Sequence, residues 1–249
     1  MKISRFLKLS PSDYPDKISA VLFTPSCNYK CPACHSKQTM YGGNNPSEKE
    51  FFDYLDSAKG WIDGVVMCGG EPTLQPDLPE FMKKIREKGL AIKLDTNGSN
   101  PTVLGKLLEE ELVDYVAMDI KGPPSLYSII VGNKIDLRDS IEKSIRITEN
   151  APDYEFRTTV VPIKRENGEL NWMNQRDARE MAEWAHKHVL DNSRKWYIQK
   201  FVARSKDEML DERFSKENLP KEMHETPTVV LEIVKNAVIQ YFPNKKIRE

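Results

Sequence analysis

Short apolar segments of strand length alternate with helical patterns along this chain, and this alternation limits its fold more than any other feature. Six such segments, rich in β-branched residues, are nearly continuous in apolar content, as expected of strands covered on both faces; they span 18–24, 65–68, 91–95, 115–119, 154–161 and 196–201. Strands that alternate with helices form a parallel sheet with right-handed crossovers. The sequence therefore predicts an α/β fold, either a doubly wound sheet or a partial barrel.

Helix signals stand between these segments. Ser47 and Glu50 have the spacing of a capping box at the start of one helix. Asp77 and Asn100 are suitable N-cap residues for two more. Further helices are predicted over 138–149, 174–190 and 227–241, the last as a C-terminal extension beyond the sixth strand.

The charge balance excludes several classes of protein. The chain has 249 residues, with 37 lysines and arginines against 38 aspartates and glutamates, and its net charge is -1. This neutrality argues against nucleic-acid phosphates or anionic lipid as the main partner. No apolar run reaches the roughly 18 residues of a membrane helix, and charges interrupt the N-terminus where a signal peptide needs an apolar core. We therefore expect a cytoplasmic protein without membrane contact.

The most unusual residues follow the predicted strands directly. Three cysteines occupy 27–34 after the first strand, and the segments 68–72, 95–98 and 119–122 follow the next three. In both α/β architectures, ligands bind at the C-terminal ends of the strands. Four loops are therefore expected to meet at one mouth.

The spacing of the cysteines, C-x3-C-x2-C at Cys27, Cys31 and Cys34, curls three thiolates around one small volume. In a reducing cytosol, such a group indicates a metal or catalytic site rather than a disulfide framework. Three kinds of site compete: zinc completed by His35, c-type haem on the pattern from Cys31 to His35, and a four-iron cluster. Three thiolates leave one iron open to substrate, whereas a fourth ligand from Cys68 would make a closed electron carrier.

These cysteines, in the loop after a first strand, resemble the signature of the radical S-adenosylmethionine (SAM) superfamily. The resemblance implies that Cys27, Cys31 and Cys34 hold a [4Fe-4S] cluster and that SAM chelates the fourth iron through its amino and carboxylate groups. One departure is Ala33, because members usually carry an aromatic residue there that packs on adenine.

A second motif, Gly69-Gly70-Glu71-Pro72, follows the second strand, where members of this superfamily carry a Gly-Gly-Glu segment that holds the amino group of SAM. Two glycines let a backbone approach a ligand closely. Glu71 supplies a carboxylate for an ammonium group.

Two later motifs, Asp95-Thr96-Asn97-Gly98 and Asp119-Ile120-Lys121, resemble segments of the glycyl-radical-enzyme activases. Examples are the activating proteins of pyruvate formate-lyase and of anaerobic ribonucleotide reductase. By this resemblance, a monovalent cation near the carboxylate of SAM would be held by Asp95, Thr96 and Asp119.

Other side chains are assigned to SAM by the same resemblance. Lys121 and Arg157 would neutralise its carboxylate, and Lys121 is placed with the cysteines among the catalytic residues. Gln199 would reach the adenosine, and His35 and Asn97 complete the predicted SAM contacts.

The resemblance implies a partial (β/α)6 barrel over 1–201, with a charged segment and a C-terminal helix over 202–249 packed on the same domain. It also implies an enzyme that cleaves SAM and abstracts hydrogen from a glycine of a partner glycyl radical enzyme, with anaerobic ribonucleotide reductase as the expected partner and a flavodoxin- or ferredoxin-type reductant. The charged stretch 202–226 is expected to be solvated or to face the partner. The alternatives are a radical SAM enzyme acting on a small molecule, nucleoside or RNA, such as a 7-carboxy-7-deazaguanine synthase, and a non-catalytic electron carrier.

Overall fold

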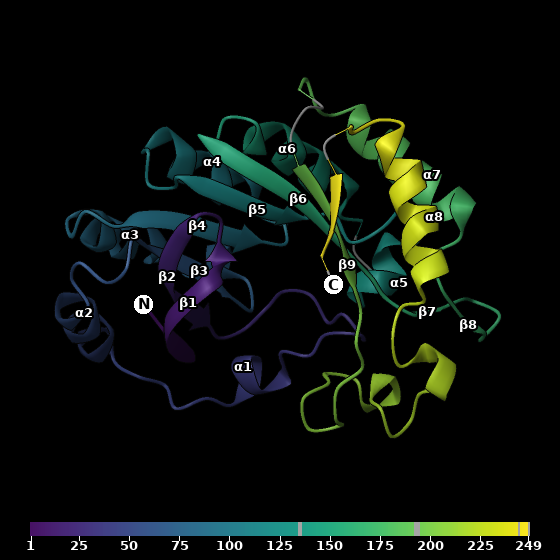
Figure 1. Ribbon diagram of the computed structural model, residues 1–249, viewed down its shortest axis with the longest axis horizontal. Helices are drawn as coiled ribbons and strands as arrows, with labels where there is room; N and C mark the ends of the chain where they lie inside the picture. Colours follow the sequence, from purple (N-terminus) through teal and green to yellow (C-terminus); the bar gives the residue numbers. More distant parts are fainter. Residues whose placement is uncertain (134–135, 192–194, 244, 249) are drawn as a thin grey trace.

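The computed structural model describes residues 1–133, 136–191, 195–243 and 245–248. An eight-stranded sheet curls into a half-barrel, with most helices on its outer side (Figure 1). In their order across the sheet, the strands are β1 (Arg5–Tyr14), β2 (Lys17–Thr24), β3 (Gly64–Gly69), β4 (Ala91–Thr96), β5 (Tyr115–Asp119), β6 (Asp153–Val160), β9 (Lys195–Lys200) and β10 (Lys245–Arg248). Neighbours pair in parallel except β1 and β2, which form an antiparallel hairpin.

Six of the parallel strands, β2 to β6 and β9, are the six segments predicted from the sequence, so the partial (β/α)6 barrel is confirmed. Their register brings the strand ends to one rim. Thr24 of β2 stands opposite Gly69 of β3, and Asp119 of β5 stands opposite Arg157 of β6. The loops predicted to carry the chemistry therefore meet at the same end of the half-barrel.

Two strands of the sheet lie outside the prediction. β1 is an antiparallel edge strand with mostly exposed side chains, and two register shifts and Pro11 interrupt it. It lacks the continuous apolar content of a strand covered on both faces. β10 has four residues and pairs with β9 through its backbone. The short strands β7 (Ile163–Lys164) and β8 (Leu170–Asn171) form a separate hairpin.

Capping by side chains explains where some of the helices begin. The capping box of Ser47 and Glu50 is present at α2, and the Asn100 side chain caps α4. Asp77 precedes α3 as predicted, but its carboxylate pairs with the ammonium of Met1 and makes no cap hydrogen bond. The α-helices are α1 (Lys37–Tyr41), α2 (Glu48–Ser57), α3 (Leu78–Arg86), α4 (Pro101–Glu109), α5 (Tyr127–Val131), α6 (Arg138–Thr148), α7 (Gln175–His186) and α8 (Thr228–Ile239).

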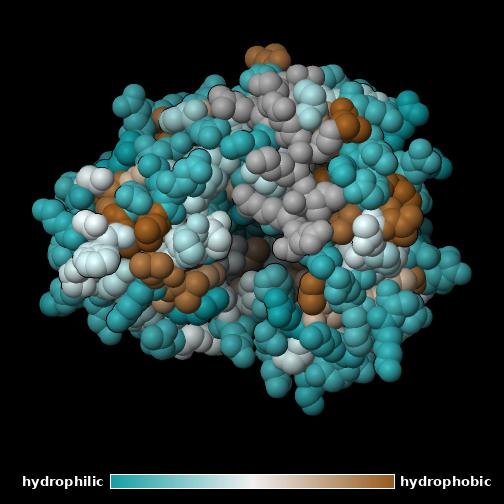
Figure 2. Space-filling model, viewed as in Figure 1, coloured by the Kyte–Doolittle hydropathy of each residue, from teal (hydrophilic) through white to brown (hydrophobic). Residues whose placement is uncertain are grey.

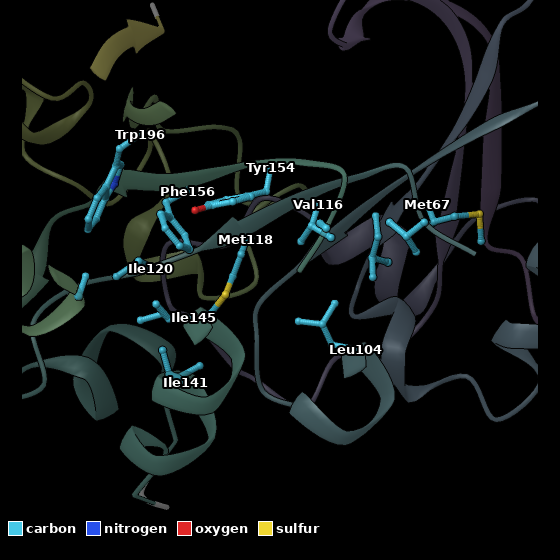
Figure 3. Packing of buried hydrophobic residues seen from close by; sticks show 14 of the residues in the cluster. Met67, Leu104, Val116, Met118, Ile120, Ile141, Ile145, Tyr154, Phe156 and Trp196 are labelled. Carbon is cyan, nitrogen blue, oxygen red and sulfur yellow. The ribbon is translucent and has the colours of Figure 1, made fainter. Parts of the chain in front are cut away.

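The main core lies between the sheet and the helices outside it. Figure 3 shows Met118 of β5 directed toward Ile141 and Ile145 of α6, and all three are fully buried. At the C-terminal end, α8 adds a buried face to the same core: Val230, Leu231, Val234, Ala237 and Val238. Since side chains alternate between the two faces of a strand, the opposite face of the sheet lines the interior of the half-barrel. No helix among the described residues is long and apolar enough to cross a bilayer.

The end of β3 lies against the loop that follows β2. The Gly70 N–H donates to the Thr24 carbonyl and the Glu71 N–H donates to the Ser26 carbonyl, each at 2.9 Å. A Cβ atom on Gly70 would lie 1.7 Å from the Ser26 oxygen, and Gly69 has a φ of +114°. Only glycines permit this approach of one backbone to another.

We expect Gly70→Ala to destabilise the protein by at least about 2 kcal/mol, because the clash is with backbone that cannot rotate away. Gly105→Ala is the matched control. Its Cβ would meet only Ile147, at 3.9 Å, and it lies inside α4, so a gain of up to about 1 kcal/mol is expected from helix propensity. Chemical denaturation of both variants measures the difference. Equal stabilities would contradict the proposed role of the glycine contact.

Candidate functional site

A cavity of ≈ 590 Å³ opens at the C-terminal ends of the parallel strands, within the range of ordinary ligand sites. The face drawn in Figure 2 is hollowed near its centre. Pro72 is buried at the start of a 3-10 turn (Pro72–Leu74) and does not line the cavity. The other predicted site residues do line it: Cys27, Cys31, Cys34, His35, Gly69, Gly70, Glu71, Asp95, Thr96, Asn97, Asp119, Lys121, Arg157 and Gln199.

The cysteine loop, residues 25–36, takes its position from three distant parts of the chain. The glycine pair at the end of β3 fixes its start, as described above. The Lys30 N–H donates to the Val131 carbonyl at 2.9 Å, where α5 ends. The Leu210 N–H donates to the Cys34 carbonyl at 2.7 Å. These contacts hold a loop of irregular backbone in one shape.

The third contact comes from the charged stretch 202–226. Its apolar residues are interleaved with the charges and form a cluster with Ala33 and Phe201: Ala203, Met209, Phe214 and Leu219. In Figure 1 this stretch lies beside α1 below the half-barrel. The stretch therefore packs on the cysteine loop, and the small side chain of Ala33 is covered by residues from outside the motif.

Burial and one cation set the electrostatics of the thiols. Burial raises the pKa of Cys31 to about 12, and the nearby ammonium of Lys121 opposes this rise. Burial also raises the pKa of Cys27, whose sulfur accepts hydrogen bonds from the Tyr29 N–H at 3.4 Å and the Asn97 amide at 3.7 Å. Thiols in this setting favour ionisation only with compensating positive charge, such as a bound metal centre.

Among residues 1–133, 136–191 and 195–243, no three His, Cys, Asp or Glu side chains stand close enough together to hold one metal ion. A mononuclear zinc site needs such convergence. In a four-iron cluster each cysteine binds a different iron, so its ligands stand further apart.

Glu71 is fully buried, and protein groups occupy its carboxylate. Oε1 accepts hydrogen bonds from the Thr73 hydroxyl at 2.7 Å and the Thr96 hydroxyl at 2.8 Å, and Oε2 accepts from the Asn97 N–H at 2.7 Å. Burial raises the pKa of Glu71, and these bonds offset part of the rise. The side chain ties the end of β3 to the end of β4, next to the cavity.

Asp95 and Asp119 lie on either side of Arg157. Arg157 donates from Nη1 to Asp95 at 2.9 Å and from Nε to Asp119 at 3.1 Å. Lys93 pairs with the remaining oxygen of Asp95, and Lys121 donates to the remaining oxygen of Asp119 at 2.9 Å. Every carboxylate oxygen of this pair therefore has a cationic donor.

The same charges set the protonation states of this network. Burial alone would raise the pKa values of Asp95 and Asp119, but Arg157 and the two lysines outweigh it, so both pKa values lie below their usual range. Burial lowers the pKa of Lys121, but Asp119 and Cys31 outweigh it and the pKa is raised. Asp95, Asp119, Lys121 and Arg157 are therefore charged at neutral pH.

Gln199 and His35 lie apart from this network. Gln199 accepts a hydrogen bond from the Thr159 hydroxyl at 3.3 Å and lines the cavity from β9. His35 is exposed at the edge of the cavity beside Arg204.

Sequence reasoning missed Lys93, whose side chain is 2% exposed and pairs with Asp95. The sequence pattern that could have revealed this pairing is the position of Lys93 two residues before Asp95 in the same strand, which places both side chains on the same face. Phe201 and Arg204 also line the cavity. Nothing in the sequence marked them, because the path of the chain after β9 decides whether they reach it.

Comparison with known proteins agrees with this geometry. Residues 21–171 match the model of the radical SAM superfamily. The chain is 32% identical over 246 residues to the Methanocaldococcus jannaschii protein named "Putative glycyl-radical enzyme activating enzyme MJ1227", covering 96% of this chain and 95% of the relative. It is 32% identical over 103 residues to the 7-carboxy-7-deazaguanine synthase of Thermoplasma acidophilum, covering 41% of this chain and 46% of that protein.

The fold also resembles solved structures. The crystal structure of Streptococcus suis SuiB superposes with a TM-score of 0.60 at 15% identity, covering 92% of this chain and 49% of that chain. The present chain thus spans about half the length of SuiB, and the likeness concerns the fold alone. The matching family model and the nearly full-length relative decide the family. The chain belongs to the radical SAM superfamily, which implies a [4Fe-4S] cluster and SAM as its cofactors.

Proposed function

We propose that Cys27, Cys31 and Cys34 hold the [4Fe-4S] cluster, that SAM binds beside it in the same cavity, and that the chain activates a glycyl radical enzyme. The observation that carries the proposal is that three thiols of one loop line a single cavity together with the Gly-Gly-Glu segment and a cationic network. The relative named as an activating enzyme, matched over nearly its full length, supports the choice of reaction.

The residues of the chain have separate tasks in this proposal. The three cysteines would hold the cluster, and the iron left without a protein ligand would be open to SAM. Lys121 places its ammonium near Cys31, where it attracts both the anionic cluster and the carboxylate of SAM. Glu71 acts as a positioning residue that fixes the rim, because its carboxylate is already hydrogen-bonded by Thr73, Thr96 and Asn97. Gln199 and His35 bind the adenosine half.

When bound and reduced, a cluster held by these cysteines would supply the electron that cleaves SAM to methionine and a 5′-deoxyadenosyl radical, and that radical would take a hydrogen atom from a glycine of the partner. The electron comes from a flavodoxin- or ferredoxin-type protein. The partner is an anaerobic ribonucleotide reductase. The half-barrel leaves room for a loop of the partner, because the sheet ends at β1 and β10 without closing.

The stretch 202–226 belongs to the same domain as the barrel in this proposal. Its packing on Ala33 and its hydrogen bond to the Cys34 carbonyl support that assignment. Its exposed charges then face the partner at the edge of the cavity, while its apolar residues brace the cluster loop.

A second candidate is a radical SAM enzyme that modifies a small molecule. The partial match to a 7-carboxy-7-deazaguanine synthase supports it. The match covers less than half of each protein, and the activating enzyme is therefore preferred.

Replacing any one of Cys27, Cys31 or Cys34 by Ala is expected to abolish the cluster, because three ligands are the fewest that hold it at this site. Cys68→Ala is the matched control, since Cys68 lines the same cavity. Iron and sulfide assays on anaerobically reconstituted protein, with the visible absorption spectrum, measure the outcome. Loss of the cluster in the Cys68 variant would show that a fourth cysteine closes it and would defeat the proposed SAM position.

Dithionite-reduced protein is expected to convert SAM to 5′-deoxyadenosine, and to place a glycyl radical doublet on an added anaerobic ribonucleotide reductase. Chromatography of the nucleoside and electron paramagnetic resonance of the mixture measure the two products. The Cys31→Ala protein serves as the inactive control. Nucleoside formation without a doublet on any glycyl radical enzyme would favour the small-molecule candidate, and no nucleoside at all would favour an electron carrier.

A further inference from the structure

We infer that Arg157 takes the place of the monovalent cation that the activase resemblance implies, so that this chain binds SAM without an alkali metal ion. The expected ligands of that ion were Asp95, Thr96 and Asp119. The position between the two carboxylates is filled by the guanidinium of Arg157, which bridges them at 2.9 Å and 3.1 Å. Arg157 is therefore a positioning residue that performs the task of the ion.

The remaining ligand atoms are also engaged. Lys93 and Lys121 hold the outer oxygens of the two carboxylates. The Thr96 hydroxyl donates to Glu71 at 2.8 Å and accepts from the Gly98 N–H at 3.1 Å. Hard cations need several oxygen ligands that are free to coordinate them. This donor set offers oxygens that cationic donors already hold, so the residues do not fit an alkali ion.

Charge repulsion also disfavours an alkali ion at this position. An ion placed between Asp95 and Asp119 would lie within contact distance of a guanidinium, with an ammonium beyond each carboxylate. Like charges at such separations disfavour binding, and the effect is larger in a partly buried site than in water. The same arrangement favours an anion at the cavity, since Lys121 lines it. A carboxylate is such an anion, because it accepts charge-assisted hydrogen bonds from a lysine ammonium.

Arginine suits this task for two reasons. Its planar fork reaches two carboxylates at once, and its charge is permanent. The bridge joins β4, β5 and β6 at the rim, because Asp95, Asp119 and Arg157 come from these three strands. It thereby fixes Asp119 and, through it, the ammonium of Lys121. The claim that Arg157 positions Lys121 for SAM rests on the proposed function, whereas the claim that no alkali ion binds here does not.

The test compares salts of equal ionic strength. Thermal unfolding of the reconstituted protein without SAM is measured in potassium, sodium and choline chloride. For the wild-type chain we expect the same Tm in all three, within about 1 °C. For Arg157→Gln, which leaves two carboxylates without their shared cation, we expect potassium or sodium to raise the Tm by about 2–4 °C over choline, with saturation.

Arg138→Gln is the matched control, because Arg138 also forms a two-pronged pair with an aspartate, the exposed Asp136. It is expected to show no dependence on the choice of cation. Saturable stabilisation of the wild-type protein by an alkali ion would overturn the inference, and so would a folded Arg157→Gln protein that does not respond to one. If Arg157→Gln does not fold in any of the salts, the wild-type comparison alone decides.

A second measurement separates this inference from the proposed function. Calorimetric titration of SAM into the wild-type protein is expected to give the same Kd in potassium and choline chloride within about twofold, a difference of less than 1 kcal/mol. Weaker SAM binding in choline would overturn the inference. Absence of SAM binding in every salt would defeat the proposed function, while the unfolding experiment would still decide whether the site takes an alkali ion.

Discussion

The cysteine loop depends on one close approach of backbone to backbone, where the glycine pair at the end of β3 meets the residues that follow β2. Two hydrogen bonds of 2.9 Å join these segments, and no side chain fits between them. The glycines line the cavity and also allow this close approach of the neighbouring backbone. The loop that carries the cysteines is thereby attached to the most regular part of the fold, and α5 and the stretch 202–226 fix the rest of it.

A second constraint is the charge inside the half-barrel. Four charged side chains from three strands, together with Lys121 just beyond β5, compensate one another at the rim. Their contacts depend on the parallel register that brings the strand ends together. Removing a single member would leave a partly buried charge without its partner, which costs more than the pair contributes. The rim is therefore a prearranged electrostatic surface beside the cysteines.

The parallel sheet, two helix starts and the position of the candidate site were predictable from the sequence, for physical reasons. The six buried strands are continuous in apolar residues, and Ser47 and Asn100 make the caps that their positions indicate. The site residues could be placed because parallel strands deliver their C-terminal ends to one rim. The edge strand β1 was not predictable, since its side chains are exposed and it lacks a continuous apolar run. The pairing of Lys93, the role of Glu71 and the packing of Phe214 on Ala33 depend on tertiary contacts that no local pattern encodes.

The central claim is that the polypeptide leaves one iron corner vacant and that SAM fills it beside Lys121. Electron–nuclear double resonance of the reduced protein with SAM labelled in its carboxylate and amino groups tests this claim most directly. The account predicts hyperfine coupling between the labelled atoms and the cluster. A fully formed cluster that shows no coupling to either label, with SAM present in saturating amounts, would contradict it.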